Sequence, residues 1–400
     1  MAFVHEYGGP ETEYRDDPNS GWVWVDDLHP VDPEIDPELL EFAHEIEIPI
    51  VIDEVIAQIN EEHLGLGHDR FVTHELARPY RHPDTGLPIF EYGPADGKTA
   101  VVVPFQFIGG TDESLNMRLY LLKRVLDAMN ITDEDGQEIR VVGIASPSVA
   151  VRMGIHLKDY VEMFKTAEHD KYTQHISKTL GLLGVERVIT AGASLGGMVS
   201  AQLVEQMLRT GELDPIGSAI ANPPGQGRSR GSIPRAMLGS LIRYNRSGGD
   251  TRSLVHASGL EPLIKMLPNL KEYKGRQLPR LSRALDIGDM ACRSMGHPGN
   301  LGLGRVLSER TTPPAMKLGL SRGLPIDYFF SLGDKVPFMR RGLKEVNNLK
   351  RQFPGLLDLV YTPDQAHEVV SDPRLMTAFY VRLIQRALRE TADNHDTDVD

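Results

Sequence analysis

Short apolar runs alternate with amphipathic segments along most of the chain beyond residue 70. Six runs are apolar enough to predict buried parallel strands, because a strand covered on both faces has no polar side. They span residues 99–107, 139–146, 186–191, 216–222, 325–332 and 356–361. Segments with helical spacing follow at 114–129, 157–184, 338–353 and 373–391. This alternation predicts an α/β fold, a mainly parallel sheet with helices on both faces.

The N-terminal part of the chain follows a different pattern. From Pro37 to about His63 the apolar residues have a broken helical period, which Pro49 divides into two helices. We expect an accessory helical segment that packs on the main body. A partner-binding or oligomerising arm is the alternative interpretation.

A turn sequence follows at residues 83–86, which read PDTG. Pro, Asp and Gly favour tight turns, each for its own conformational reason. Residues 71–81 and 87–93 on either side therefore predict a β-hairpin.

About 100 residues without a convincing strand interrupt the alternation. They contain several short amphipathic stretches and the prolines Pro234, Pro262, Pro268, Pro279, Pro298, Pro313 and Pro314. The sequence therefore predicts a helical lid inserted into an α/β core. The predicted division is an acidic extension at 1–69, a core in two parts at 70–222 and 325–391, the lid at 223–324, and an acidic disordered tail at 392–400.

One predicted strand-to-helix junction carries chemistry. Residues 185–205 read VERVITAGASLGGMVSAQLVE, a β-branched strand, a G-x-S-x-G pattern centred on Ser194, and an apolar helix. A serine at the apex of a sharp strand-to-helix turn is a nucleophile elbow, and small neighbours let strand and helix pass closely. Ser194 is the candidate nucleophile. The alternative is a glycine-rich turn whose serine caps the helix.

A second G-x-S-x-G match is centred on Ser229. It follows a Pro-Pro-Gly sequence, has an arginine on each side of the serine, and has no strand directly before it. We expect no catalytic role for this serine.

An elbow serine needs a base and a group that orients the base. Asp334 follows the predicted strand at 325–332, and His367 follows the strand at 356–361. The chain order of nucleophile, acid and histidine is that of elbow hydrolases. We therefore predict the triad Ser194, Asp334 and His367, with Asp364 as the competing acid.

The segment GASLGGMVSAQL resembles the elbow of α/β-hydrolases related to enol-lactonases, haloperoxidase-like esterases and homoserine acetyltransferases. The resemblance covers about residues 70–390, and the lid lies at the usual insertion point of that fold. The family commonly has His-Gly after its first central strand, where this chain reads PFQFIGG at 104–110. We expect the Leu195 backbone N–H to be one oxyanion donor, and that of Gln106 or Phe107 to be the second.

Composition limits the classes of function. The chain has 400 residues and a net charge of −13, which argues against nucleic acid as the main partner. It has no run of 18 apolar residues and no signal-peptide pattern at its start, so we expect no membrane span. Cys292 is the single cysteine, and we expect no intramolecular disulfide and a cytoplasmic location. The histidine spacing predicts no metal site, and we expect no cofactor.

Charge is unevenly distributed along the chain. Residues 1–62 hold 18 acidic residues and one basic residue, whereas residues 223–325 hold 17 Lys and Arg and 6 Asp and Glu. A solvated basic face is the simplest interpretation of the second segment. Docking on the acidic extension and binding of an anionic substrate are the alternatives.

These features predict a serine hydrolase that cleaves a small-molecule carboxylic ester, lactone or thioester through an acyl-enzyme. An acyltransferase with the same triad is a second hypothesis. A catalytically silent binding protein with the same fold is the third. The sequence leaves the oligomeric state open.

Overall fold

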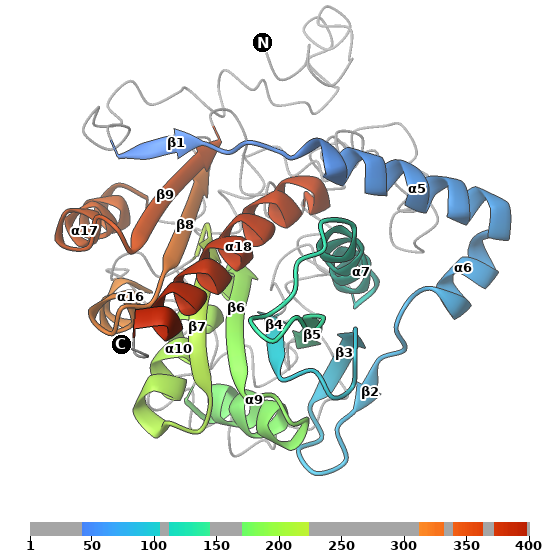
Figure 1. Ribbon diagram of the computed structural model, residues 1–400, viewed down its shortest axis with the longest axis horizontal. Helices are drawn as coiled ribbons and strands as arrows, with labels where there is room; N and C mark the ends of the chain where they lie inside the picture. Colours follow the sequence, from blue (N-terminus) through green and yellow to red (C-terminus); the bar gives the residue numbers. More distant parts are fainter. Residues whose placement is uncertain are drawn as a thin grey trace, which may run out of the picture.

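The computed structural model describes residues 42–104, 112–144, 170–223, 312–331, 339–362 and 372–397. These residues form one twisted sheet with helices on both of its faces (Figure 1). Most of the predicted extension and lid, and the last residues of the predicted tail, lie outside the described residues.

The described sheet has nine strands in the order β1-β9-β8-β7-β6-β4-β5-β3-β2. The strands are β1 (Ala43–Glu45), β2 (Tyr80–Arg81), β3 (Pro88–Tyr92), β4 (Thr99–Pro104), β5 (Arg140–Ile144), β6 (Arg187–Ala193), β7 (Asp214–Ala221), β8 (Ile326–Ser331) and β9 (Leu357–Thr362). In this order, neighbouring strands from β1 to β5 pair in parallel. The strand β3 pairs antiparallel with β5, and β2 pairs antiparallel with β3. The six predicted parallel strands are confirmed.

Helices cover the two faces of the sheet and enclose two apolar cores. One core contains residues of α5 (Ile50–Leu66), α6 (His68–His74), α7 (Asp112–Ala128) and α18 (Pro373–Thr397). The other contains residues of α9 (Asp170–Leu182), α10 (Leu195–Thr210), α16 (Thr312–Ser321) and α17 (Met339–Gln352). Both faces are therefore buried, as the continuous apolar strands require.

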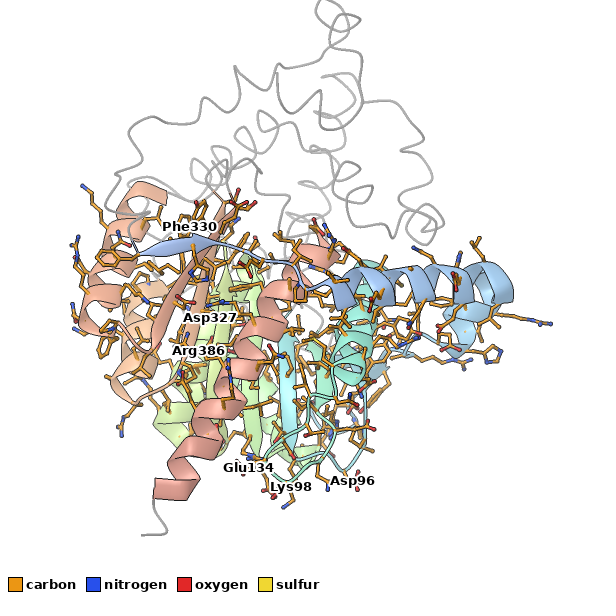
Figure 2. The ribbon with its side chains drawn as sticks, turned by 45° about the horizontal axis from the view of Figure 1, so that its top comes forward. Asp96, Lys98, Glu134, Asp327, Phe330 and Arg386 are labelled. Atoms are coloured by element: carbon orange, nitrogen blue, oxygen red, sulfur yellow. The ribbon has the colours of Figure 1, made fainter. Side chains whose placement is uncertain are left out.

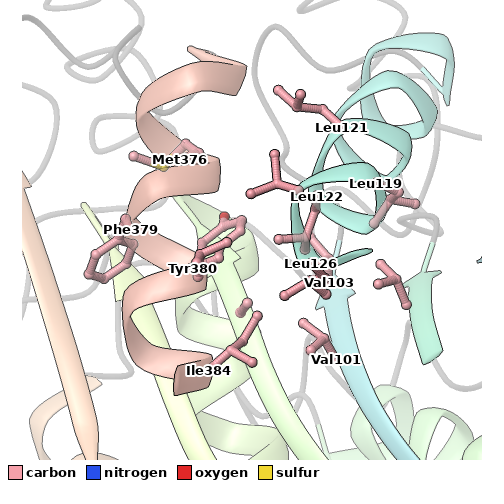
Figure 3. Packing of buried hydrophobic residues seen from close by; sticks show 14 of the residues in the cluster. Val101, Val103, Leu119, Leu121, Leu122, Leu126, Met376, Phe379, Tyr380 and Ile384 are labelled. Carbon is pink, nitrogen blue, oxygen red and sulfur yellow. The ribbon is translucent and has the colours of Figure 1, made fainter. Parts of the chain in front are cut away.

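The strand β4 contributes side chains to both cores in alternation. Val101 and Val103 lie in the first core, while Ala100 and Val102 lie in the second. Figure 3 shows Val101 and Val103 below Leu122 and Leu126 of α7, with α18 opposite. The period of two along a strand explains this division.

The N-terminal segment departs from the prediction. The prediction of a helix before Pro49 is wrong at residues 43–45, which form β1 and pair in parallel with β9 from Ala43 opposite Leu359. The N–H of Ile46 extends this ladder to the carbonyl oxygen of Tyr361 at 3.0 Å. Three residues are too few to show a strand period, so their conformation depends on the partner strand.

The hairpin is confirmed around its turn but begins later than predicted. Tyr80 lies opposite Ile89 across the β2–β3 pair, and Gly86 in the turn has φ +66°. Phe71, predicted as the start of the first strand, instead lies in α6 and is completely buried. The large apolar side chain indicated burial, but burial is compatible with a helix as well as with a strand.

Two helices extend beyond their predicted place. The helix predicted to end at residue 391 continues to Thr397. Residues 312–321, within the span assigned to the lid, form α16, which contributes Ala315, Met316 and Leu320 to the second core. The described end of the lid span is therefore part of the packed body.

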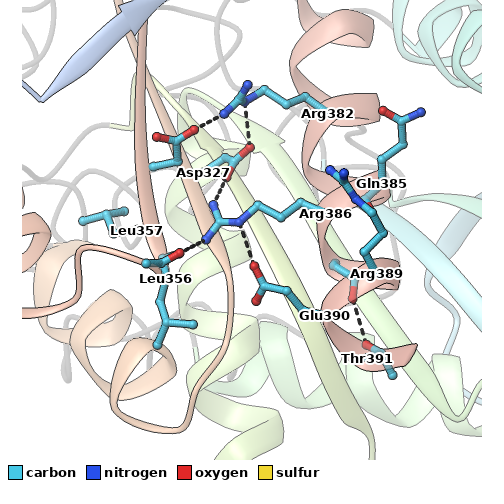
Figure 4. A network of polar contacts seen from close by, with 12 residues as sticks. Asp327, Leu356, Leu357, Arg382, Gln385, Arg386, Arg389, Glu390 and Thr391 are labelled. Carbon is cyan, nitrogen blue, oxygen red and sulfur yellow. Dashed lines mark hydrogen bonds and ion pairs between the residues drawn. The ribbon is translucent and has the colours of Figure 1, made fainter. Parts of the chain in front are cut away.

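An ion-pair network around the buried carboxylate of Asp327 joins α18 to the sheet (Figure 4). The carboxylate of Asp327 in β8 has no exposed surface, and Arg386 Nη1 donates to its Oδ1 at 2.6 Å. Arg382 Nε lies 3.4 Å from Oδ2, and Arg382 also pairs with Asp358 of β9. Burial raises the pKa of Asp327 to about 6, although both arginines oppose the rise.

Further ion pairs lie at the amino-terminal end of the strands. Figure 2 shows Lys98 and Glu134 at this end and Phe330 near the opposite end. Lys98 Nζ lies 2.9 Å from Glu186, and Arg187 Nη2 lies 3.2 Å from Asp133. These ion pairs connect the residues at the starts of β4 and β6 with each other and with the segment between α7 and β5, at the edge opposite the strands' carboxyl ends.

Candidate active site

Ser194 occupies the sharp turn between the last residue of β6 and the first residue of α10. Its backbone has φ 54° and ψ −126°, a combination that a residue with a side chain rarely adopts. The Ser194 N–H stabilises the turn by donating to the carbonyl oxygen of Ala221 at 2.9 Å. The Gly197 N–H donates to the Ser194 carbonyl oxygen at 3.0 Å. Such strain persists only where surrounding bonds enforce it, which is typical of functional sites.

Glycines permit the close passage of β6 and α10. A Cβ placed on Gly192 would lie 2.5 Å from Ser200 Oγ and closer still to the Gly196 carbonyl group. A Cβ on Gly197 would lie 3.1 Å from the Gly192 carbonyl oxygen. The small residues of the motif therefore have a steric reason as well as a conformational one.

The N-terminus of α10 lies directly beside Ser194. Leu195 is the first helical residue, and the N–H groups of a first helical turn have no intrahelical acceptor. The helix dipole adds partial positive charge at this end. The Leu195 side chain is buried in the second core, which fixes the backbone that carries this N–H.

Three neighbouring strands end at the same edge of the sheet as the elbow. The last residues of β7, β8 and β9 are Ala221, Ser331 and Thr362. These strands run parallel to β6, so their carboxyl ends lie on the side of Ser194.

Asn222 follows β7 directly and was not singled out from the sequence. It is completely buried, has φ +39°, and its Oδ1 accepts a hydrogen bond from the Ser331 N–H at 2.9 Å. Its own N–H donates to the carbonyl oxygen of Phe329 at 2.9 Å. The sequence signal that could have identified this residue is a polar amide directly after an otherwise apolar strand.

Several predicted site residues lie outside the described residues. These are Asp334, His367, the competing acid Asp364, the second serine Ser229, and the oxyanion candidates Gln106 and Phe107. The structure brings Ser194 and Leu195 together. For the others it describes the preceding strands, which are β4, β7, β8 and β9.

Within the described ranges, no group of three or more His, Cys, Asp or Glu side chains is arranged to hold a metal ion. In the same ranges, every helix is too short or too polar to cross a membrane.

Comparison with solved structures finds distant likenesses. A membrane phospholipase A described as a bacterial virulence factor is 13% identical, with 85% of this chain and 93% of that chain covered and a TM-score of 0.47. A carboxylesterase of the thaumarchaeon Nitrososphaera gargenis is 14% identical, with coverage of 78% and 100% and a TM-score of 0.46. A bromoperoxidase from Bacillus anthracis is 14% identical, with coverage of 78% and 99% and a TM-score of 0.45.

No protein-family model matches the sequence, and no curated protein matches it. The fold is nevertheless defined by the molecule itself. A mostly parallel sheet has its elbow after the central strand β6, and antiparallel β3 and β2 close one edge. With the strained serine between β6 and α10, this arrangement gives the chain the α/β-hydrolase fold.

Proposed function

We propose that the protein is a serine hydrolase that cleaves a carboxylic ester of a small molecule through an acyl-enzyme on Ser194. The observation that carries the proposal is the backbone conformation of Ser194 at the start of α10. A serine that merely caps a helix has extended φ and ψ, and its hydroxyl accepts a bond from the first turn. Ser194 has φ +54° and makes no such capping bond.

The proposed mechanism uses the residues that follow the parallel strands. His367 takes the proton of the Ser194 hydroxyl as the oxygen attacks the ester carbonyl carbon, and Asp334 holds the imidazole tautomer. The oxyanion binds the Leu195 N–H and a second N–H from Gln106 or Phe107. The leaving alcohol receives the proton from His367. Water then attacks the acyl-enzyme, with His367 acting as base again, and releases the acid.

The test combines active-site labelling with ester hydrolysis. Wild type and Ser194→Ala are incubated with a fluorophosphonate probe and with p-nitrophenyl esters of two to twelve carbons. We expect labelling of the wild type and a loss of roughly 10⁴-fold or more in kcat for Ser194→Ala. The chain-length optimum would then measure the acyl pocket.

Two serine variants serve as matched controls. Ser200→Ala removes a buried hydroxyl of α10 that has no hydrogen-bond partner among the described residues, and we expect it to retain activity. Ser229→Ala removes the second motif serine and should also retain activity. Equal turnover by wild type and Ser194→Ala would refute the nucleophile. Labelling with transfer only to an added alcohol would instead indicate an acyltransferase.

A further inference from the structure

The parallel pairing of β7 with β8 follows a regular hydrogen-bond pattern up to the end of β7. In such a ladder, a residue donates its N–H to the residue before its opposite neighbour and accepts from the residue after that neighbour. Ser218 shows the pattern, since it lies opposite Ile326 and its N–H donates to the Pro325 carbonyl oxygen at 3.1 Å. The pattern therefore states which partners each later residue of β7 should have.

Asn222 follows this pattern with its N–H and departs from it with its acceptor. Ala221 lies opposite Phe329, so Asn222 is next in register and in line with Phe330. The Asn222 N–H donates to the Phe329 carbonyl oxygen at 2.9 Å, as the ladder requires. The Ser331 N–H, however, donates at 2.9 Å to the side-chain Oδ1 of Asn222. The side-chain oxygen therefore takes the place of the main-chain carbonyl in the ladder.

This exchange lets the backbone turn out of β7 while β8 keeps its last bond. Asn222 has φ +39°, a strained conformation that asparagine tolerates better than most residues. The amide is completely buried, and among the described residues no acceptor lies within hydrogen-bonding distance of its Nδ2. A buried donor without an acceptor is unfavourable. The strain and the unpaired donor are both costs of a side chain whose oxygen completes the ladder.

The peptide group between Ala221 and Asn222 joins this ladder to the elbow. Its carbonyl oxygen accepts from the Ser194 N–H at 2.9 Å, and its N–H donates to Phe329 at 2.9 Å. A trans peptide is planar, so the two groups lie in one plane and point in opposite directions. A tilt of this plane therefore disturbs both bonds. The side-chain bond to Ser331 restrains the tilt, because it holds Asn222 against the same strand.

We propose that Asn222 is a positioning residue for the nucleophile and acts on Ser194 through the Ala221 carbonyl group. The inference rests on the proposed function, in which Ser194 attacks the ester. The strained backbone of Ser194 persists only where surrounding bonds enforce it, and this hydrogen bond is one of them. The Ala221 carbonyl oxygen also lies close to α10, since a Cβ on Gly197 would lie 3.2 Å from it. A displaced carbonyl group would therefore disturb both the serine and the first turn of α10.

Two variants separate the side-chain oxygen from the backbone turn. Asn222→Gly adopts positive φ freely but removes the acceptor for the Ser331 N–H. Asn222→Asp retains this oxygen, nearly retains the size of the side chain, and tolerates positive φ. We expect Asn222→Gly to lower kcat for p-nitrophenyl acetate about 10-fold to 100-fold and to change KM less than about threefold, because the serine is displaced. Asn222→Asp should recover kcat to within about fivefold of wild type, and the rate of fluorophosphonate labelling should follow kcat in both variants.

Ser218→Ala is the matched control for a general weakening of the sheet. It removes the buried 2.8 Å contact between Thr190 Oγ1 and Ser218 Oγ, which joins β6 and β7 before the elbow. We expect Ser218→Ala to lower the thermal midpoint and to keep kcat within about twofold of wild type. Equal losses of kcat in Ser218→Ala and Asn222→Gly would overturn the inference. A folded Asn222→Asp variant no more active than Asn222→Gly would also overturn it.

A further variant covers the case in which Asn222→Gly does not fold. Asn222→Ser is then used, because its hydroxyl oxygen is one bond closer to the backbone and cannot occupy the position of Oδ1. The comparison with Ser218→Ala decides the inference even without Asn222→Asp. Absence of labelling and turnover in the wild type would refute the proposed function, and the inference with it. A labelled wild type whose Asn222→Gly variant reacts at the same rate would overturn the inference alone.

Discussion

Gly192 lies where β6 and α10 approach each other most closely, and its replacement by alanine is a sharp test of the elbow. The new methyl carbon would lie 2.5 Å from Ser200 Oγ, whereas ordinary contacts begin at 3.4 Å. It would also overlap the backbone carbonyl of Gly196, which cannot rotate away as a side chain can. The start of α10 must therefore move by about 1 Å relative to β6.

This displacement affects catalysis more than stability. A misplacement of about 1 Å at the reacting groups costs about 100-fold in rate. Overpacking of a buried site lowers the free energy of unfolding by about 1–3 kcal/mol. We therefore expect Gly192→Ala to remain folded, to lose about 100-fold in kcat for p-nitrophenyl acetate, and to react more slowly with the fluorophosphonate probe.

Two other glycines complete a graded series. A Cβ on Gly197 would lie 3.1 and 3.2 Å from two carbonyl oxygens, so Gly197→Ala should have a smaller effect. Gly181 in α9 has open space around it, and Gly181→Ala should leave activity unchanged and raise stability by up to about 1 kcal/mol. Activity of Gly192→Ala within threefold of wild type would refute the steric account of the elbow.

Two predictions concern buried charge, both measured by urea unfolding. Arg386→Met removes the donor that lies 2.6 Å from Asp327, and it should lower the free energy of unfolding by about 3–5 kcal/mol. Arg389→Met on the same helix is the control and should change the free energy of unfolding by less than about 0.5 kcal/mol. Equal effects of the two variants would contradict the stabilising role of the network. Burial raises the pKa of Asp372, which caps α18, from 3.8 to about 6. Between about pH 4 and pH 6 the folded protein therefore binds more protons at this carboxyl group than the unfolded chain does, and the free energy of unfolding falls as the pH rises. Asp372→Asn keeps the cap without the charge and should stabilise by up to about 3 kcal/mol at pH 7, a gain that disappears below about pH 4; a gain independent of pH would contradict the assignment.

The sequence by itself determined the elements whose signal is local. The central strands were predictable because strands buried on both faces are continuously apolar, as in residues 99–104 of β4. The elbow was predictable for a similar reason, since five consecutive residues around Ser194 contain the small side chains that a sharp turn requires. In both cases the pattern and the structure it specifies lie within a few residues of each other.

Only the tertiary structure decided the features that depend on a distant partner. Residues 43–45 become a strand because β9 accepts them at its edge, a pairing with residues more than 300 positions away. Asp327 lies in an otherwise apolar run and is held there by Arg382 and Arg386, which come from the last helix. The buried hydrogen bond from the Ser331 N–H to Asn222 Oδ1 likewise joins residues 109 positions apart. Such partners are brought together by packing of the whole chain, and no local period encodes them.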